Sequence, residues 1–486
     1  MPVDGVIQRG HTNVNEAMLT GESAPIEKAE GDDVIGGSLN GAAAITIKVT
    51  KTGEDTYVSQ VVEMVRSAQE ARSRTQDFAN RAALWLTLIA ISAGLGTFIG
   101  WIVANGNVAF TLERAVTVMV ITCPHALGLA IPLVVAVSTA LGAKSGLLIR
   151  DRSAFERARS LDTVVFDKTG TLTEGGFAVT DVVPFAEAID ETLLLKAAAI
   201  EAQSEHPIAQ AIVRRAKILG ISTSGANGVS EKPGMGVEGR LKNETIKVVS
   251  PKYVQESGLK VDHSKTQELE TQGKTIAYVI VDNDAIGVIA LADTVRKTAP
   301  GAIRKLKNMG LEVIMLTGDG EDVARWVSER IGLDRYFAEV LPDRKAEIIR
   351  KLKSDGRVVA MVGDGVNDAP ALVAADVGIG IGAGTDVAVE AADIVLVHSD
   401  PRDVVGILQL ARSTYRKMVQ NLWWAAGYNI VAIPLAAGAL STIGVLLSPA
   451  AGAALMSLST VIVAINARLL GKASRRSALE QKLPAV

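Results

Sequence analysis

The chain has 486 residues, of which 48% are apolar and 21% are charged, and its formal net charge is −3. At roughly 100–200 residues per domain, this length predicts two to four domains. The near-neutral charge excludes nucleic acid as an expected partner, because a phosphate backbone requires a basic face. Cys123 is the single cysteine, which excludes an intramolecular disulfide framework and any CxxC zinc or redox motif.

The N-terminal segment has the composition of a β-rich domain. Residues 1–66 are rich in Gly, Val and Thr, with short apolar runs such as 42–49. Such runs are typical of β-strands. We therefore expect a β domain over residues 1–66, followed by a linker over residues 67–81.

Long uncharged runs predict membrane spans. Residues 82–112, 115–143 and 422–467 carry no formal charge. About 20 apolar residues in a helix cross about 30 Å of hydrocarbon. Ser448 and Pro449 interrupt the last run near its middle, as a turn between two spans does. The sequence therefore predicts four transmembrane helices in two hairpins.

The hairpins are expected over residues 82–143 and 413–470, in contact with a lipid bilayer. Lys and Arg residues flank both hairpins on the side of the long intervening segment and of the chain termini. By the positive-inside tendency, both termini are cytoplasmic, including a tail over residues 471–486. We expect an integral protein of the cell membrane whose large domains face the cytoplasm.

The segment between the hairpins has the pattern of an α/β domain. Residues 163–166, 312–316 and 358–362 are short apolar runs, each followed by a loop that carries Asp and Gly. Buried parallel strands that end in polar loops are typical of an open α/β sheet. The expected domain is divided in sequence, over residues 144–175 and 291–412.

A second domain is expected inside the first one. Residues 176–290 have a helical pattern of their own over 191–219 and strand patterns over 275–281 and 285–291. We interpret this segment as an α+β domain inserted into the α/β domain.

The first apolar strand is followed directly by the motif DKTGTLT, residues 167–173. An ionised Asp at the end of a strand can attack phosphorus and form an acyl phosphate. The motif resembles the phosphorylation signature of P-type ATPases, and further motifs of that family follow in the family's order. The resemblance covers nearly the whole chain and implies a Rossmann-like, haloacid-dehalogenase-like phosphorylation domain, with Asp167 as the residue that accepts phosphate from ATP.

The resemblance implies a catalytic set around Asp167. Two further apolar strands are followed by the Thr317–Gly318–Asp319 motif and by the GDGVND motif, residues 363–368. Three strand ends therefore converge on one crevice. Lys345 resembles the phosphate-binding lysine of the family and would offset charge on the transferred group. Carboxylates at strand ends provide oxygen ligands for Mg²⁺. The expected Mg²⁺ ligands are Asp167, the main-chain carbonyl of Thr169, Asp364 and Asp368.

Two other motifs complete the expected cycle. TGES, residues 20–23, resembles the actuator loop of the family, in which Glu22 positions the water that hydrolyses the aspartyl phosphate. SEHP and GMG in the inserted domain resemble the nucleotide-binding set of the heavy-metal-transporting branch. The implied ATP-binding residues are Glu201, His206, Gly234 and Gly236.

The second uncharged run contains Cys123-Pro124-His125. Pro124 cannot donate to the helix ladder and leaves a carbonyl free. Ionisable residues at membrane depth are costly and usually functional. A thiolate with an imidazole favours a soft or borderline metal, with copper or silver preferred over zinc. Cu⁺ and Ag⁺ fit the thiolate best, while the imidazole also suits Cu²⁺.

The last hairpin offers further ligands. Tyr428 and Asn429 supply oxygens, and the spacing of Met456, Ser459 and Thr460 places them on one helical face. CPH, GYN and MSLST together resemble the copper- or silver-exporting type of the heavy-metal branch. The candidate ligands of the transported ion are Cys123, His125, Met456, Tyr428, Asn429 and Ser459.

Two alternatives remain open at the level of sequence. The Asp motif alone would suit a phosphatase or phosphomutase of the same α/β fold, although such an enzyme has no use for four spans or for TGES. The chain also lacks the earlier membrane helices of the family and the start of its actuator domain, which predicts an N-terminally truncated, inactive fragment as the other alternative.

Overall fold

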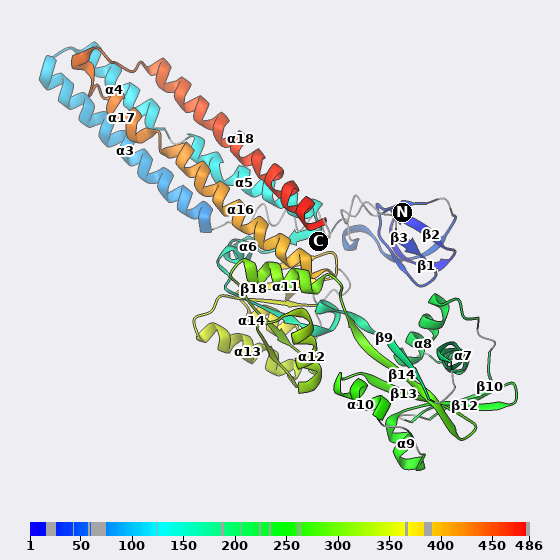
Figure 1. Ribbon diagram of the computed structural model, residues 1–486. Helices are drawn as coiled ribbons and strands as arrows, with labels where there is room; N and C mark the ends of the chain where they lie inside the picture. Colours follow the sequence, from blue (N-terminus) through cyan, green and yellow to red (C-terminus); the bar gives the residue numbers. More distant parts are fainter. Residues whose placement is uncertain are drawn as a thin grey trace. The chain divides into compact units, whose positions relative to one another are not determined.

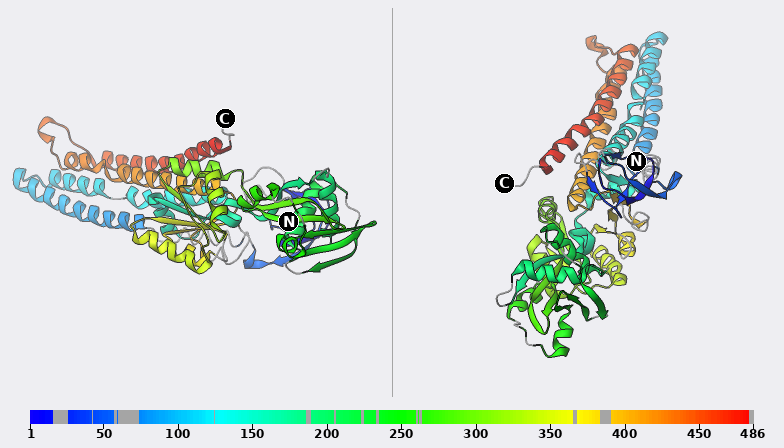
Figure 2. Two further views of the ribbon diagram at one scale, coloured as in Figure 1. Left: turned by 60° about the horizontal axis from the view of Figure 1, so that its bottom comes forward. Right: turned by 90° about the vertical axis from the view of Figure 1, so that its right-hand side faces the viewer.

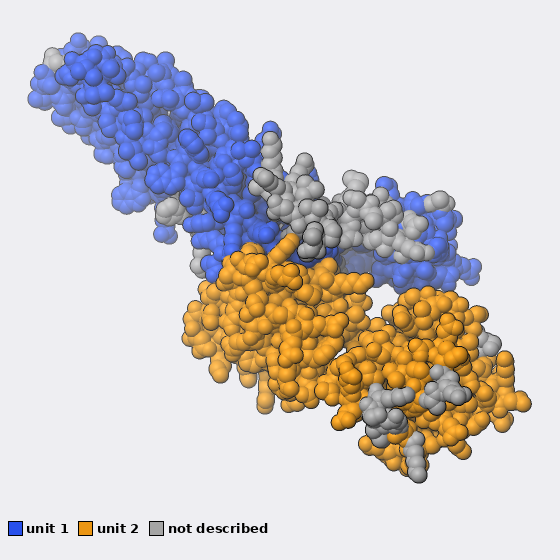
Figure 3. Space-filling model, in the orientation of Figure 1, with its two compact units in different colours: residues 1–161, 376–398, 402–486 blue, residues 162–375, 399–401 orange. Residues whose placement is uncertain are grey.

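The computed structural model describes most of the chain, and Figure 1 labels its elements. The described residues are 1–15, 26–41, 43–56, 59, 74–123, 125–185, 189–204, 206–222, 225–232, 235–259, 261, 264–364, 368–382 and 391–482. They form two compact units, coloured separately in Figure 3. The first comprises residues 1–161, 376–398 and 402–486, and the second comprises residues 162–375 and 399–401.

The N-terminal part of the first unit is built from β-strands, as its composition predicts. Two three-stranded sheets surround buried Ile7, Val14 and Val34. One sheet has the order β4 (Asp33–Val34), β1 (Asp4–Arg9), β6 (Thr46–Lys51). The other has the order β3 (Ile26–Lys28), β2 (Thr12–Asn15), β5 (Leu39–Asn40). The strand expected at 42–49 begins later than expected, at Thr46.

Long helices form the apolar part of the first unit and lie side by side in Figures 1 and 2. Among the described residues, three stretches are by length and composition apolar enough to cross a membrane: Arg81–Ala104, Val108–Lys144 and Pro449–Gly471. Their outer faces expose apolar side chains such as Leu84, Trp85 and Val103, as helices surrounded by lipid do. The helices are α3 (Arg74–Asn105), α4 (Val108–Thr122), α5 (His125–Lys144), α16 (Pro401–Ala426), α17 (Asn429–Ala436) and α18 (Pro449–Lys482).

Two of the four expected spans are not continuous helices, because the second is divided between α4 and α5. The expected third span is divided between α16 and α17, because the helix stops at Ala426 and starts again at Asn429. Gly427 at this break has a low helix propensity, and Pro434 within α17 cannot donate to the helix ladder. The expected turn at Pro449 is present, since this residue begins α18.

The second unit holds a parallel sheet at its core. Four strands run in the order β16 (Arg335–Phe337), β15 (Glu312–Leu316), β8 (Thr163–Asp167), β17 (Val359–Gly363), and all neighbours are parallel. The accompanying helices are α11 (Ala299–Asn308), α12 (Glu321–Ile331), α13 (Pro342–Ser354) and α14 (Ala369–Ala374). Three more strands and a short helix belong to the first unit: β18 (Val377–Ile381), β19 (Ile394–Leu396), β7 (Leu147–Ile149) and α6 (Arg152–Arg157).

An antiparallel sheet forms the rest of the second unit. Its order is β10 (Asn227–Lys232), β11 (Gly236–Leu241), β12 (Glu244–Val249), β13 (Thr275–Val281), β14 (Asp284–Val295), β9 (Thr173–Pro184). Helices α7 (Asp190–Glu201) and α8 (Pro207–Ile218) pack on one face, and α9 (Pro251–Ser257) and α10 (Ser264–Thr271) pack on the other.

The single helix expected over 191–219 is wrong, because α7 and α8 are separate helices. His206 caps α8 by accepting a hydrogen bond from the Ile208 amide, and Pro207 occupies the first helical position. Proline has no N–H to donate and therefore starts a helix more readily than it continues one. This break brings His206 to the surface of the antiparallel sheet, where a nucleotide site is expected.

Candidate functional site

The expected phosphorylation site lies at the carboxyl ends of three neighbouring parallel strands. Asp167 is the last residue of β8, Thr317 follows β15, and Asp364 follows β17. Because β8 lies between β15 and β17, the three polar loops meet at one edge of the sheet. This edge is where ligands bind in open α/β sheets.

Lys345 joins two of the expected carboxylates. Its Nζ lies 2.5 Å from Oδ1 of Asp167 and 2.7 Å from Oδ1 of Asp368. All three side chains are buried, with exposed fractions of 6% for Lys345, 6% for Asp167 and 1% for Asp368. A shared ammonium group thus offsets two buried carboxylates, and the structure brings these three expected site residues together.

Burial and neighbouring charges shift the pKa values of Asp167 and Lys345. It raises the pKa of Asp167 to about 7, with the neighbouring Asp368 and Asp364 carboxylates acting in the same direction and Lys345 opposing them. Burial lowers the pKa of Lys345, but Asp167 and Asp368 outweigh it, so this pKa lies above its ordinary value. A strongly shifted carboxyl in a crevice is typical of a reactive site.

This shift predicts how stability depends on pH. The pKa of Asp167 rises from 3.8 when unfolded to about 7 when folded, so folding disfavours its ionised form. Stability is therefore lost as pH rises from about 4 to about 7. We expect Asp167→Asn to raise the thermal midpoint of the metal-free protein more at pH 8 than at pH 5. Calorimetry at both pH values checks this, and an equal shift at both would contradict it.

Asp319 forms an ion pair with a lysine of the DKTGTLT motif. Its Oδ2 lies 2.5 Å from Nζ of Lys168 and accepts a hydrogen bond from Thr317 Oγ1 at 2.9 Å. Lys168 is the residue after Asp167 and is itself buried. The Thr317–Gly318–Asp319 loop thus fixes the DKTGTLT loop by an ion pair. The spacing of Lys168 and Asp319 in the sequence does not predict this pair.

Two further residues hold the same loop from the other side. Asp293 accepts hydrogen bonds from Thr173 Oγ1 at 2.5 Å and from the Gly175 amide at 3.0 Å. Arg296 donates from Nη2 to the Gly170 carbonyl at 3.0 Å. Strands β9 and β14 connect the antiparallel and parallel sheets. Asp293 lies near the end of β14 and Arg296 directly follows it, so both residues position the loop that carries Asp167.

The carboxylates near Gly170 show whether a divalent cation fits beside the DKTGTLT loop. Gly170 has a φ of +73°, and a Cβ built there would lie 2.5 Å from Oδ2 of Asp364, so this carboxylate lies directly against the DKTGTLT loop. Oδ2 of Asp368 has no hydrogen-bond partner among the described residues. Three carboxylates with one ammonium leave an excess of negative charge, which suits a hard cation.

Within the described part of the chain, no three His, Cys, Asp or Glu side chains form a ready-made metal cage. Mg²⁺ does not need one, because it is usually held by one or two carboxylates together with substrate phosphates and water. The exposed Thr169 adjoins the same loop and offers the expected carbonyl. The donor set therefore fits Mg²⁺ in the presence of a phosphate substrate.

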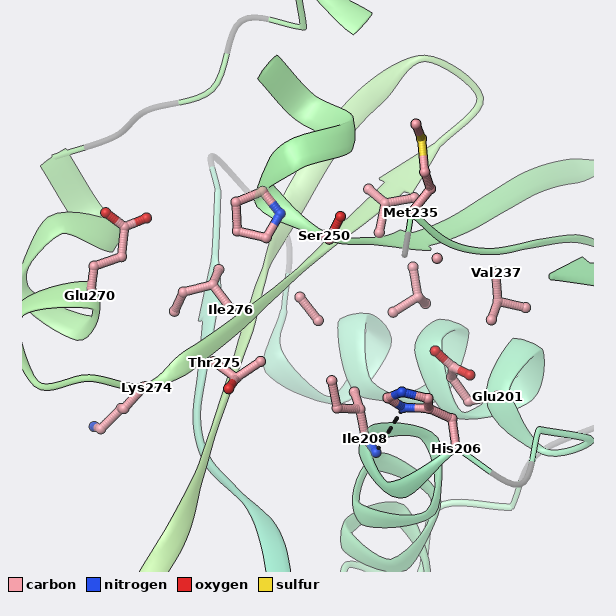
Figure 4. Close-up of a pocket in the computed structure, with 15 residues that line it drawn as sticks. Glu201, His206, Ile208, Met235, Val237, Ser250, Glu270, Lys274, Thr275 and Ile276 are labelled. Atoms are coloured by element: carbon pink, nitrogen blue, oxygen red, sulfur yellow. Dashed lines mark hydrogen bonds between the residues drawn. The ribbon is translucent and has the colours of Figure 1, made fainter. Parts of the chain in front are cut away.

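The antiparallel sheet contains a cavity of about 550 Å³ lined by Glu201, His206 and Gly236 (Figure 4). The Nδ1 atom of His206 accepts a hydrogen bond from the Ile208 amide at 3.3 Å, which leaves Nε2 as the donor. Much of the remaining lining is apolar. A mostly apolar cavity of this size with a few polar groups is typical of a small-molecule site. Gly234, the fourth expected residue, lies outside the described residues.

Gly236 is required by the backbone of this cavity. Its φ is +135°, and a Cβ there would lie 2.2 Å from the carbonyl oxygen of Val248. Gly236→Ala must therefore separate β11 from β12, and we expect at least about a tenfold loss of nucleotide affinity. Calorimetric titration with ATP checks this, with Gly225→Ala as a control, because nothing lies within 4 Å of a Cβ at Gly225 and its φ is not in the left-handed region. Unchanged affinity in Gly236→Ala would contradict it.

The expected ion-binding residues of the second span lie at a helix break. α4 ends at Thr122, Cys123 caps it, and α5 begins at His125. The His125 amide donates to the Cys123 carbonyl at 2.9 Å, and both side chains are exposed. Pro124 lies outside the described residues.

The other expected ion ligands lie where α16, α17 and α18 pack. Tyr428 donates to the Ile121 carbonyl at 3.3 Å, two residues before Cys123 at the α4–α5 break. Ser459 is buried and donates to the Trp424 carbonyl at 2.9 Å. Asn429 is 3% exposed, and neither amide atom has a hydrogen-bond partner in the described structure. A buried, unpaired amide is costly, so Asn429 stays a candidate ligand.

Met456 is half-buried one turn before Ser459 and Thr460 on α18. Its carbonyl accepts a hydrogen bond from Thr460 Oγ1 at 3.2 Å. The structure thus records contacts of individual expected ligands with neighbouring helices. Glu22, the expected hydrolytic residue, lies outside the described residues.

Comparison with known families gives two matches. Residues 161–376 match the model of haloacid dehalogenase-like hydrolases. Residues 1–66 match the model of the P-type ATPase actuator domain.

Individual relatives cover almost all of the chain. A copper-exporting P-type ATPase B of Archaeoglobus fulgidus is 60% identical over 470 residues, which are 97% of this chain and 68% of that protein. A probable copper-transporting P-type ATPase B of Staphylococcus aureus is 46% identical over 96% of this chain and 70% of its own length. The crystal structure of a zinc-transporting PIB-type ATPase in the E2.Pi state is similar at a TM-score of 0.71 and 31% identity, over 97% of this chain and 76% of that chain.

Proposed function

The chain belongs to the P-type ATPases, and from this premise we propose that it exports copper ions across a membrane at the expense of ATP. The observation that carries the proposal is the buried Asp167–Lys345–Asp368 group at the end of β8. A buried carboxylate beside an ammonium group, at the edge of a parallel sheet, is placed to accept a phosphoryl group.

The proposed first step is an in-line transfer. An Oδ atom of Asp167 forms a bond to the γ-phosphorus of ATP, the bond to the β-phosphate oxygen breaks, and ADP leaves. Lys345 offsets charge on the transferred group, while the Thr317–Gly318–Asp319 loop holds Lys168 and thereby the DKTGTLT loop. Asp167, the Thr169 carbonyl, Asp364 and Asp368 would hold Mg²⁺, which neutralises phosphate charge when it is bound.

The cavity of the antiparallel sheet is the proposed ATP site. Nε2 of His206 and the carboxylate of Glu201 are the polar groups offered to adenine, and Gly234 and Gly236 let the backbone approach it. In the second half of the cycle, Glu22 positions the water that hydrolyses the aspartyl phosphate. A catalytic residue on a separate domain allows hydrolysis to wait for a conformational change.

Copper is the proposed cargo because both relatives described above carry copper in their names. The ligand set of Cys123, His125 and Met456 is soft, which suits Cu⁺ and Ag⁺, while His125 also suits Cu²⁺. Asn429 supports an ion site through its unpaired amide, together with Tyr428 and Ser459.

The proposed arrangement places the hairpins 82–143 and 413–470 in the bilayer and both termini in the cytoplasm. Residues 1–66 would form the actuator, 67–81 the linker and 471–486 the tail. Residues 144–175 and 291–412 would form the phosphorylation domain that carries Asp167, and residues 176–290 would form the nucleotide-binding domain.

The test of cargo is ATP-dependent accumulation of metal in sealed proteoliposomes that contain the purified chain. We expect Cu⁺ and Ag⁺ to accumulate in preference to Zn²⁺, and Cys123→Ser to abolish accumulation. Accumulation of Zn²⁺ alone would overturn the cargo, and accumulation without ATP would overturn the coupling.

A further inference from the structure

The nucleotide cavity has two chemically different ends. Glu201 and His206 lie at one end, and Glu270 and Lys274 lie at the opposite end in Figure 4. Apolar side chains such as Ile208 and Ile276 lie between them. An elongated ligand with an apolar ring at one end and charged groups at the other matches this division.

The strand register shows which end leads to Asp167. Thr275, the first residue of β13, pairs with Leu291 of β14, and Val295 of β14 pairs with Thr173, the last residue of the DKTGTLT motif. At about 3.3 Å per residue, the four residues from Leu291 to Val295 span about 13 Å. The Lys274 end of the cavity is therefore the end from which the two connecting strands run to the phosphorylation loop.

Lys274 is the only Lys or Arg that lines the cavity in the described structure. Its side chain is 9% exposed, and its Nζ lies 2.6 Å from Oδ2 of Asp181 on β9. Glu270 is the other charged group at this end. In Figure 4 the ammonium group points away from His206. The cavity thus holds its single strong cation at the end nearest Asp167, paired with a carboxylate in the absence of ligand.

We propose that Lys274 binds the phosphate groups of ATP and exchanges its partner Asp181 for them. The proposal rests on the proposed function, which makes this cavity an ATP site. It deepens that function by fixing the direction of the nucleotide, with adenine at His206 and the phosphates towards Asp167. The flexible stem of lysine allows its ammonium group to turn from Asp181 to a phosphate without movement of the backbone.

In this exchange, the Asp181 carboxylate competes with the ATP phosphates for the ammonium group of Lys274. Asp181 Oδ2 also accepts a hydrogen bond from Thr180 Oγ1 at 2.7 Å, so the carboxylate keeps a partner when Lys274 leaves it. The Asp181 side chain is also 37% exposed, so phosphate binding leaves this carboxylate with a hydrogen-bond partner and in contact with solvent.

The experiment compares ligands that share adenosine and differ in phosphate. Titration calorimetry on the full chain measures Kd for ATP, ADP and adenosine in wild type, Lys274→Met and Lys274→Arg. We expect Lys274→Met to raise the Kd for ATP about tenfold, because a charge-assisted hydrogen bond is lost. The Kd for adenosine should be unchanged. Lys274→Arg should stay within about threefold of wild type for ATP, because it keeps the charge.

Two further variants make the result specific. Asp181→Asn removes the carboxylate that competes with phosphate for Lys274. It should lower the Kd for ATP by a few-fold without a change in adenosine binding. Lys252→Met is the matched control, because Lys252 is an exposed lysine of the same domain that does not line the cavity. Its Kd values should equal those of wild type.

The outcomes separate this inference from the proposed function. If wild type binds ATP and Lys274→Met binds it equally well, the inference alone is overturned. Equal weakening of ATP and adenosine also overturns it, since this would reflect damage to the whole cavity. If wild type binds neither ATP nor adenosine, the cavity is not a nucleotide site, and both the proposed function and the inference fail.

Discussion

Asp167→Asn is expected to abolish the acid-stable phosphoenzyme and to lower ATP hydrolysis by at least about 10⁴-fold. The amide of Asn cannot act as the nucleophile that forms an acyl phosphate. The fold should survive, because Asn has nearly the same shape and removes a carboxylate whose ionisation folding disfavours. Labelling with γ-³²P-ATP followed by acid quenching measures the phosphoenzyme directly.

The matched control for this substitution is Glu174→Gln. Glu174 is an exposed carboxylate directly after the DKTGTLT motif, at the start of β9. Its replacement changes the net charge by the same amount and should leave labelling at the wild-type level. Labelled protein in Asp167→Asn would contradict the assignment of Asp167, and loss of label in Glu174→Gln would show that any charge change in this loop suffices.

Lys345→Met is expected to lower the rate of phosphoenzyme formation by about 10²- to 10³-fold. Removal of one preorganised charge from a transition state typically has an effect of this size. The variant also leaves the buried Asp167 and Asp368 carboxylates without their shared cation, which raises the pKa of Asp167 further and disfavours the nucleophilic form. Rapid-quench labelling at saturating ATP checks this prediction.

Two companion variants separate charge from packing. Lys345→Arg keeps the positive charge in a different shape and should retain more activity than Lys345→Met. Lys351→Met removes an exposed lysine from the same helix, α13, and should behave as wild type. A wild-type labelling rate in Lys345→Met would refute the role of this lysine in phosphoryl transfer.

The sequence predicted the phosphorylation sheet well because its strands are local signals. The strand predicted at 312–316 is β15 (Glu312–Leu316). The strand predicted at 163–166 lacks only the last residue of β8 (Thr163–Asp167), and the one at 358–362 is shifted by one residue from β17 (Val359–Gly363). Short apolar runs that end in an Asp-bearing loop depend little on the rest of the chain. Convergence of their carboxyl ends then follows from parallel pairing.

Other features depend on contacts between distant residues and could not be predicted. Asp293 lies 120 positions after Thr173 and accepts a hydrogen bond from its hydroxyl. The Lys168–Asp319 pair likewise joins loops from different strands. Neither pair has a sequence spacing that periodicity detects. The break at His206 differs, because its signal is local: residues 203–206 are polar, and Pro207 is typical of a helix start.

The proposed export of copper at the expense of ATP requires that a metal ion bound in the membrane part permits phosphorylation of Asp167. The most direct test is phosphoenzyme formation from γ-³²P-ATP with and without Cu⁺, in wild type, Cys123→Ser and Asp167→Asn. We expect label in wild type that rises with Cu⁺, label that no longer responds to Cu⁺ in Cys123→Ser, and no label in Asp167→Asn. Wild-type label that is independent of every metal tested, or an intact Cu⁺ response in Cys123→Ser, would contradict the claim.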